Sequence, residues 1–440
     1  MTRDDDPAIT ADMTRPDSDP LAPADPGLAP RVPAADAATG ASGLHVKASP
    51  DPDPAPAPSA GSVPGLDVPA GLNGVAVAAT EVGDVRGAEG FFHYREHDAT
   101  TLARTRTFEE VWHLFVYGHL PDEDERAAFR AKVTDRRFVP DALDPVVAAV
   151  GALDAPPLAR LSSVVSAGRN ELGLAPLLDL DGKRRRSQGL TLAAFVPSAV
   201  AALHRTSKGL TPVAPDPSLG HVASYLHEAT GELPHPAHVR ALEQYLIATI
   251  DHGFNASTFT ARVVASTGAD LADVVAGALG SLAGPLHGGA PGRALDALDA
   301  IGTPERAADF VRSEVAAGRR IMGFGHAVYR NVDPRSTLMR EVALGLGGEL
   351  VERAVAVEAA ILDALAELKP DRALPSNVEY YAGVVMASVG LPREMFTPTF
   401  AVSRTVGWCA HALEQAATRK LIRPAARYVG PAPTVATPAT

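Results

Sequence analysis

Ionisable side chains in this sequence gather at glycine-rich breaks between apolar stretches, where a bend in the backbone can turn them into a cleft. Histidines, one glutamate and several arginines recur there, and such groups can move protons and bind carboxylates. The segments are DHGFNAST at Asp251–Thr258, GPLHGGA at Gly284–Ala290, IMGFGHAVYRNVDPR at Ile321–Arg335, NVEYY at Asn377–Tyr381 and SRTVGW at Ser403–Trp408.

Each of these residues also has a structural explanation when it is taken alone. A histidine beside glycine can hydrogen-bond a carbonyl at a helix end, and Glu379 can be a first-turn acid that the helix dipole favours. Arg335 can pair with a surface carboxylate, and the core is the expected place for Trp408 and Tyr329. The recurrence of ionisable groups at successive breaks nevertheless favours one shared site.

A metallohydrolase is an alternative interpretation of four of these residues, His252, His287, His326 and Glu379. The sequence contains no HExxH motif. These segments also hold no two histidines four residues apart, the spacing that places two zinc ligands on one helix face. We therefore expect no metal, and an activity that chelators leave unchanged.

The elements around these breaks are predicted to be helices. Apolar residues from Leu271 to Leu282 follow helical spacing, and GPLHGG ends that run. Thr303 followed by Pro304 is a typical helix start. The threonine can cap the helix, and the N–H that proline lacks would have no partner within the first turn. Gly318 is the predicted end of that helix.

The rest of the chain indicates more helices and very little sheet. Asp333-Pro334 repeats the start signal, and the apolar spacing over Val357–Leu368 predicts a helix that Pro370 ends. A segment near Phe91–Tyr94 can form a hairpin, but alternating patterns are scarce after residue 100. The predicted architecture is mostly α.

Composition limits the classes of function. The chain has 440 residues, a net charge of −12 and one cysteine, Cys409. The charge argues against nucleic acid as a partner, and the single cysteine fits a reducing cytoplasm. No apolar run reaches the roughly 18 residues of a membrane span. Residues 1–64 are rich in Pro, Ala and Asp, and we predict a disordered leader there.

Several of these motifs together resemble the active-site signatures of citrate synthases. They are GPLHGGA, GFGHAVYRNVDPR, NVEYY and SRTVGWCAHALEQ, and the resemblance runs from about Gly74 to LIRPAARYVGP near the end. It implies a mostly α homodimer with no metal and no tightly bound cofactor. It also implies a large domain made of residues 65–283 and 393–440 and a smaller mobile acyl-CoA-binding domain at residues 284–392.

The resemblance further implies a condensation of acetyl-CoA with oxaloacetate and assigns a role to each acid–base residue. Glu379 would remove a proton from the thioester methyl group while His287 stabilises the enol. His326 would donate to the ketone of oxaloacetate, and His252 would contribute to substrate binding. Because a thioester methyl is a very weak carbon acid, base and donor must act together.

The arginines would hold the anionic parts of both substrates. Arg335 and Arg404 match positions that bind the oxaloacetate carboxylates, and Arg423 matches an arginine that reaches the neighbouring subunit's site. The implied acyl-CoA positions are Arg319, Arg320, Gly323, Gly325 and Arg330.

One departure leaves the exact reaction open. Most members of this family have NVD where this chain has NVE, so the base at Glu379 sits on a longer arm; this resembles a second type of actinobacterial citrate synthase. A misplacement of about 1 Å can lower a rate 10²-fold. The alternatives are 2-methylcitrate synthase, which uses propionyl-CoA, and a paralogue that binds oxaloacetate or acyl-CoA without catalysis.

Overall fold

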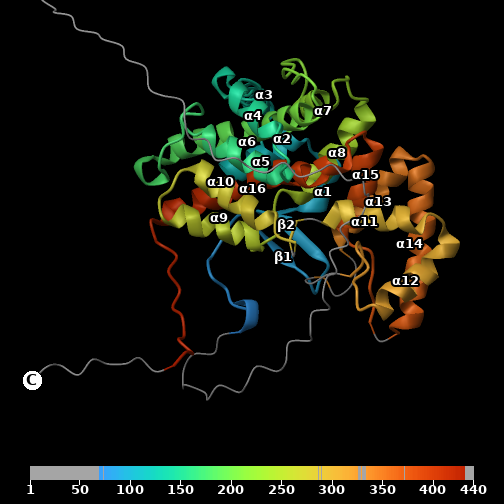
Figure 1. Ribbon diagram of the computed structural model, residues 1–440. Coiled ribbons are helices and arrows are strands. Elements are labelled where there is room, and N and C mark those ends of the chain that lie inside the picture. The colour runs from blue at the N-terminus through green and yellow to red at the C-terminus, as the bar shows by residue number, and fades with distance from the viewer. Residues whose placement is uncertain are drawn as a thin grey trace, which may run out of the picture. The chain divides into compact units, whose positions relative to one another are not determined.

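The computed structural model describes residues 69–431, except positions 73, 286, 289, 326–328, 330–332 and 371. The predicted leader at residues 1–64 lies outside these residues. Within the described part of the chain, helices dominate and the named strands lie close to its start (Figure 1). The prediction of a mostly α fold is confirmed.

The strands form a small antiparallel sheet in the order β1, β2, β3, with bounds Gly83–Arg86, Phe91–Tyr94 and His97–Asp98. This confirms the predicted hairpin, whereas the two-residue β3 is too short to have shown an alternating pattern. In β2, Phe92 and Tyr94 alternate with more exposed neighbours and are buried. The sheet therefore directs these two rings into the helical core.

The helices follow in chain order. The first eight are α1 Ala99–Thr105, α2 Phe108–Tyr117, α3 Glu123–Thr134, α4 Asp144–Gly151, α5 Pro157–Ala167, α6 Gly182–Ser207, α7 His221–Thr230 and α8 Pro236–Thr249. The others are α9 Ala256–Ser266, α10 Leu271–Leu282, α11 Ala290–Ile301, α12 Ala307–Ala316, α13 Pro334–Leu346, α14 Glu349–Leu368, α15 Val378–Ser388 and α16 Phe396–Thr418.

The local start and stop signals act where they were predicted. The helix expected over Leu271–Leu282 is α10, and α14 ends at Leu368, before Pro370. Asp333 caps α13, where its carboxylate accepts from the first-turn backbone. Thr303-Pro304 begins a short 3₁₀ turn that leads into α12, so the start signal is confirmed but the first turn is tighter than an α-helix.

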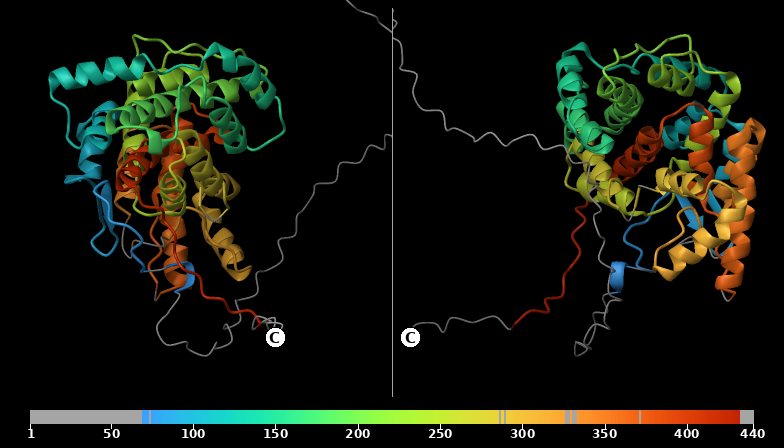
Figure 2. Two further views of the ribbon diagram at one scale, coloured as in Figure 1. Left: turned by 90° about the vertical axis from the view of Figure 1, so that its left-hand side faces the viewer. Right: turned by 45° about the vertical axis from the view of Figure 1, so that its right-hand side comes forward.

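Helix α16 forms the centre of the helical packing and contacts α6, α8, α9 and α10 (Figures 1 and 2). Most of its residues are buried, among them Trp408. A Cβ atom at Gly407 would lie 2.2 Å from the carbonyl oxygen of Ile250. Glycine is therefore required where α16 crosses the end of α8.

Helices α11 to α15 lie beside one another on one side of the structure (Figure 1). Within this group α11 and α13 pack on α15, and α12 packs on α14. These helices belong to the segment 284–392 that was predicted as the smaller domain. The division into two domains stays a prediction, since all described residues fall in one compact unit, 61–440.

Candidate active site

Two of the predicted site segments are joined by hydrogen bonds that Asn377 donates to backbone carbonyls. The side-chain amide of Asn377 donates to the carbonyl of Gly325 at 2.8 Å, and its backbone N–H donates to the carbonyl of Gly323 at 2.8 Å. Gly323 and Gly325 have positive φ angles of 86° and 78°, which residues other than glycine rarely adopt. The predicted acyl-CoA segment therefore lies against the turn that precedes Glu379.

Asp333 joins the starts of α13 and α15. Its carboxylate accepts from Nε of Arg335 at 3.1 Å and from Nη2 of Arg335 at 2.9 Å. It also accepts from the backbone N–H of Val378 at 3.3 Å. Arg335 is only 4% exposed, and Asp333 is its buried counter-charge. Asp333 thus sets the orientation of Arg335 and the position of the helix start that carries Glu379.

Glu379 occupies the first turn of α15 and is partly buried. Burial raises the pKa of its carboxyl to about 7, against the opposing effect of the Arg335 charge. No hydrogen bond from a described side chain or backbone N–H to this carboxylate offsets the loss of hydration. The chain therefore holds a carboxyl that is a stronger base than an ordinary glutamate and is still about half ionised at neutral pH.

Arg404 projects from the central helix α16 and is 3% exposed. Its Nε donates to the carbonyl of Thr249 at 2.7 Å, and its guanidinium lies 4.7 Å from the centre of the Phe400 ring. Its Nη1 is buried without a hydrogen-bond partner among the described residues. Burial lowers the pKa of Arg404 to about 10, and nearby Arg335 adds to this while Asp251 opposes it. An unpaired buried N–H donor suits an anionic ligand.

His287 lies between α10 and α11 and contacts the start of α9. Its Nε2 is 2.8 Å from the hydroxyl oxygen of Ser257, and Nε1 of Trp408 donates to the same oxygen at 3.3 Å. Burial lowers the pKa of His287 to about 4, and the charge of Arg404 lowers it further. The imidazole is therefore neutral at pH 7. Trp408 is buried, as predicted, and in addition contributes to this polar contact.

His252 lies in the segment between α8 and α9, against aromatic rings. The centre of its ring is 5.3 Å from that of Phe92 and 5.6 Å from that of Tyr329. Phe92 belongs to β2, so the small sheet forms one wall next to this histidine. Tyr329 is buried, which confirms the interpretation of that residue as part of the core.

Two buried tyrosines that the motifs did not identify lie within electrostatic reach of several predicted residues. Burial and then the charge of Glu379 raise the pKa of Tyr245, while Arg404 and Arg335 oppose this. Tyr94 responds to the same two arginines. Glu379, Arg335 and Arg404, which come from α15, α13 and α16, therefore all lie within electrostatic reach of Tyr245. In the sequence, the one feature that pointed to Tyr94 was its place in the predicted hairpin at Phe91–Tyr94. No feature of the sequence pointed to Tyr245.

Other predicted residues have different surroundings. Arg319 is exposed and forms an ion pair with Glu314 at 2.6 Å, and Arg320 is also exposed. Arg423 is exposed in the extended segment that follows α16 (Figure 2). Their roles stay predictions. His326 and Arg330 lie outside the described residues.

Among the described residues, one group of side chains has spacing that a metal ion could accept, namely His113, His119 and Glu125. It includes none of the predicted site residues. Glu125 also closes the cap of α3 by accepting from the backbone N–H of Asp122 at 3.2 Å. A helix cap and an exposed ion pair with His119 account for this group.

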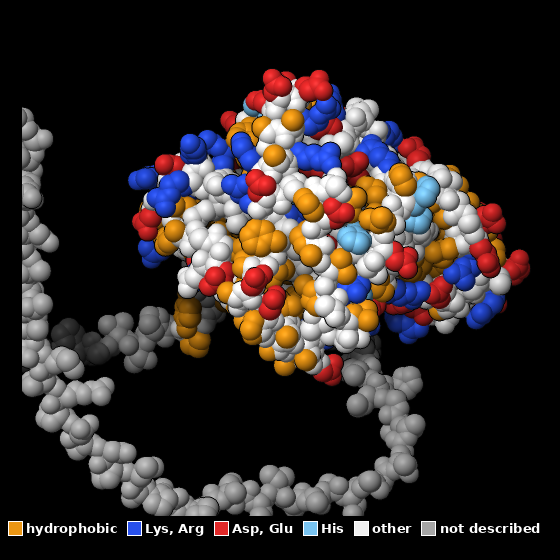
Figure 3. Space-filling model, turned by 90° about the horizontal axis from the view of Figure 1, so that it is seen from above, with side chains coloured by type: hydrophobic (Ala, Val, Ile, Leu, Met, Phe, Trp, Pro, Cys, Tyr) orange, Lys and Arg blue, Asp and Glu red, His pale blue; other side chains and the backbone are white. Residues whose placement is uncertain are grey.

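The surface carries interleaved charges on the face seen in Figure 3, where acidic and basic side chains lie next to one another. Over the described part of the chain, no helix combines the length and apolar character that crossing a bilayer requires.

Comparisons with known proteins show which proteins this chain is similar to. The family described as citrate synthase, C-terminal domain, matches residues 71–425. A Mycobacterium tuberculosis protein named "Putative citrate synthase 2" is 39% identical over 370 residues, which are 82% of this chain and 93% of that protein. The 2-methylcitrate synthase of Shewanella oneidensis is 35% identical over 83% of this chain and 95% of its own length.

A solved structure of similar fold is also named a citrate synthase. The Thermoplasma acidophilum citrate synthase, solved as a ternary complex with carboxymethyl coenzyme A and oxaloacetate, superposes with a TM-score of 0.77. The two sequences are 28% identical, and the match covers 84% of this chain and 98% of the archaeal chain.

Proposed function

Because the chain belongs to the citrate synthase family of acyltransferases, we propose that it condenses acetyl-CoA with oxaloacetate and water to give citrate and CoA. The single observation that best supports this proposal is the partly buried Glu379 carboxyl with a pKa of about 7. The chain also has the neutral imidazole of His287 and the buried guanidinium groups of Arg335 and Arg404, and the charges of Glu379 and both arginines reach Tyr245. These are the groups that enolisation and dicarboxylate binding require.

The first step is removal of a proton from the methyl group of acetyl-CoA by Glu379. A thioester methyl group is such a weak acid that a carboxylate with an ordinary pKa would have little driving force. A pKa near 7 makes the carboxylate a stronger base and still leaves about half of it ionised at neutral pH. Asp333 supports this step by fixing the start of α15 through Val378.

His287 stabilises the enol that forms on the thioester oxygen. A neutral imidazole can do so when the nitrogen that faces the substrate carries the proton. Two contacts of Nε2 with Ser257, to its hydroxyl at 2.8 Å and to its backbone N–H at 3.4 Å, hold the His287 ring beside α9. We assign the other ring nitrogen, Nδ1, to the thioester oxygen.

The other reactant, oxaloacetate, carries two carboxylates that must be paired once the site closes. Arg404, with its unpartnered Nη1, and Arg335 provide guanidinium groups on two different helices. We assign one carboxylate to each, and we place His252 beside them. By the family resemblance, His326 donates to the ketone that the enol carbon attacks.

The acyl-CoA is assigned to the segment of Gly323 and Gly325, whose carbonyls are tied to Asn377 two residues before Glu379. This proximity would deliver the thioester methyl group to the base. The flanking Arg319, Arg320 and Arg330 are proposed to bind the phosphates of CoA. We propose that the reaction uses no metal and no tightly bound cofactor.

Propionyl-CoA is the second candidate acyl donor, because relatives of both names are similarly close to this chain. One extra methylene in an apolar site changes binding by only about 1–3 kcal/mol. The test is release of free thiol from acetyl-CoA and from propionyl-CoA by purified protein, with and without oxaloacetate. We expect release that depends on oxaloacetate, a higher kcat/KM for acetyl-CoA, and no effect of EDTA.

Binding of oxaloacetate without thiol release would instead support the non-catalytic paralogue. A higher kcat/KM for propionyl-CoA would support 2-methylcitrate synthase. Loss of activity in EDTA that zinc restores would support the metallohydrolase interpretation and contradict this proposal.

We further propose a homodimer in which Arg423 completes the site of the partner subunit. Arg423 is exposed on the extended segment that follows α16, so its side chain is accessible to a partner subunit. Inactive Arg423→Ala and Glu379→Gln homodimers, mixed under subunit exchange, should regain part of the activity. No recovery, with exchange confirmed by differently tagged subunits, would contradict the shared site.

A further inference from the structure

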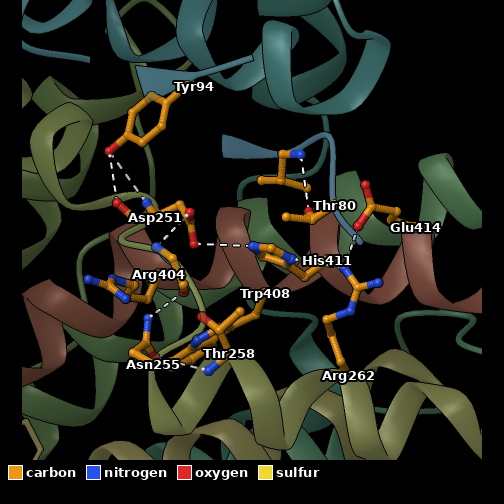
Figure 4. Close-up of polar contacts among 12 residues, drawn as sticks. Thr80, Tyr94, Asp251, Asn255, Thr258, Arg262, Arg404, Trp408, His411 and Glu414 are labelled. Atoms are coloured by element: carbon orange, nitrogen blue, oxygen red, sulfur yellow. Dashed lines mark hydrogen bonds and ion pairs between the residues drawn. The ribbon is translucent and has the colours of Figure 1, made fainter. Parts of the chain in front are cut away.

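A row of buried polar side chains continues from Arg404 along α16 and α9 (Figure 4). Nε2 of His411 lies 3.2 Å from Oδ1 of Asp251, and Nδ1 of the same ring lies 3.2 Å from Nη1 of Arg262. Arg262 also forms an ion pair with Glu414. Asp251, Arg262 and His411 are all at most 2% exposed.

The contacts of the His411 ring determine which of its nitrogens carries the proton. A guanidinium group has only N–H donors, so the contact with Arg262 makes Nδ1 of His411 an acceptor. The proton is therefore on Nε2, which donates to the Asp251 carboxylate. A neutral ring in this tautomer joins two buried groups of opposite charge and satisfies one polar atom on each.

Asp251 and Phe254 together hold the short segment that contains His252. Oδ2 of Asp251 accepts from the backbone N–H of Gly253 at 3.1 Å, and the Tyr94 hydroxyl donates to the Asp251 carbonyl at 3.2 Å. Phe254 packs edge-on against His411, with ring centres 5.8 Å apart. His411 therefore contacts the residues on both sides of the His252–Gly253 pair.

The close approach of α16 makes these contacts possible. Arg404, Gly407 and His411 lie at helical spacing on one face, and Gly407 sits directly against the carbonyl of Ile250. The negative charge of Asp251 thereby lies near the cation of Arg404 as well as near His411. A change in the Asp251 side chain would affect both the backbone at His252 and the counter-charge of Arg404.

We infer that His411 is a positioning residue for oxaloacetate binding: its Nε2–H holds Asp251, and through Asp251 it aligns His252 and Arg404. This inference rests on the proposed function, because it assigns those two residues to oxaloacetate. His411 itself touches no substrate in this arrangement. Its effect is on the affinity for the dicarboxylate and not on the acyl-CoA side of the site.

The test compares two amide substitutions that replace different parts of the ring. His411→Gln can place an amide N–H near the position of Nε2 and keep the donor to Asp251. His411→Asn reaches only as far as Nδ1, and leaves Asp251 without that donor. Cys409→Ala, a buried change on the same helix in a side chain without polar contacts, is the matched control for loss of packing.

Oxaloacetate binding is measured by titration calorimetry, and KM for both substrates and kcat by thiol release. We expect His411→Asn to raise the Kd and KM for oxaloacetate about 10-fold, with KM for acetyl-CoA unchanged. His411→Gln should stay within about threefold of the wild type, as should Cys409→Ala. In a double-mutant cycle, adding Asp251→Asn to His411→Asn should cause little further loss.

An unchanged oxaloacetate Kd in His411→Asn would overturn the inference, as would an equal loss in Cys409→Ala. If His411→Asn does not fold, Asp251→Asn is measured instead, and an unchanged Kd there would overturn it equally. Failure of the proposed function is a separate result, because in that case the wild-type protein would neither bind oxaloacetate nor release thiol.

Discussion

Glu379 and Asp251 are two carboxylates near buried arginines, but their pKa values shift in opposite directions. Burial alone would raise both. Around Asp251 the His411 ring, Arg404 and the N–H of Gly253 outweigh burial and lower the pKa. Glu379 has a neighbouring arginine but no hydrogen-bond donor among the described residues, and its pKa rises to about 7. Asp251 has both neighbouring charges and direct donors, whereas Glu379 has, among the described residues, only a neighbouring charge, and this difference separates a structural carboxylate from a reactive one.

The two regions around these carboxylates differ in the same way. The α9–α16 region pairs the side chains of Asp251, Arg262 and His411 with one another, and it holds the backbone that carries His252. The α13–α15 region leaves Glu379, at a helix start, without a donor among the described residues. Such an unpaired group costs stability, and it remains available for proton transfer.

The largest expected effect is on turnover in Glu379→Gln. The amide keeps the shape of the side chain but cannot accept a proton, so kcat should fall about 10³- to 10⁴-fold while oxaloacetate still binds. Steady-state thiol release and calorimetry measure the two quantities. Turnover close to the wild-type value would remove Glu379 from the mechanism and with it the contrast between the two carboxylates.

Glu379→Asp sharpens this prediction. The acid group is kept, but its oxygen is withdrawn by one methylene from a site built around the longer arm. We expect kcat to fall about 10²-fold, which is less than for the amide. A fall as large as that of Glu379→Gln would mean that position matters as much as basicity.

Asp251→Asn should lower stability, because it removes the charge between Arg404 and His411 in the interior. We expect a loss of about 3 kcal/mol in the free energy of unfolding at pH 7, measured by urea denaturation. The folded-state pKa of Asp251 is depressed, so its contribution is present above the unfolded value of about 3.9 and is lost as the pH falls below it. The difference from wild type should therefore shrink in acid.

Gly407→Ala tests the close packing of the α9–α16 region. Its new Cβ would meet the Ile250 carbonyl oxygen at 2.2 Å, so either α16 or the end of α8 must move. We expect a loss of about 2–3 kcal/mol in unfolding free energy. Gly280→Ala is the matched control, since a Cβ there, on helix α10, meets nothing within 4 Å.

The control should be slightly stabilising, by about 0.5–1 kcal/mol, because alanine has the higher helix propensity. Equal stability changes in both variants would contradict the claim that α16 approaches α8 through Gly407.

The smallest expected effect is a pH-dependent gain of stability in Glu379→Gln. The folded-state pKa of Glu379 is raised from 4.5 to about 7, so its stabilising contribution is complete below 4.5 and is lost as the pH rises through 7. Above that pH the wild type carries an unfavourable charge. Partial exposure limits the effect, and we expect the variant to gain about 2 kcal/mol at pH 8 and less than about 1 kcal/mol at pH 5.

Thermal unfolding of both proteins at the two pH values checks this. A stability difference that does not change with pH would mean that Glu379 titrates as an ordinary glutamate, and that the contrast with Asp251 does not exist.

Local signals in the sequence predicted the elements well. The end of α14 before Pro370 and the start of α13 at Asp333-Pro334 depend on neighbours a few residues away, so they can be read from the chain. The motifs also selected Glu379, His287 and Arg404 as candidate site residues, because an acid, an imidazole and a guanidinium have the same chemistry wherever they lie. Local patterns could not indicate Tyr245, or the contacts of Ser257 and His411, since these depend on distant helices coming together.

The sequence by itself determined which chemical groups are available, where several of the helices begin or end, and the family to which the chain belongs. The tertiary structure alone decided the charge state of those groups. Glu379 and Asp251 are ordinary acids in the sequence, and they differ only after folding brings the Nε2–H of His411 to Asp251 and leaves Glu379 without a donor from any described residue. Protonation depends on hydration and on donors contributed by distant segments, and a linear pattern does not contain that information.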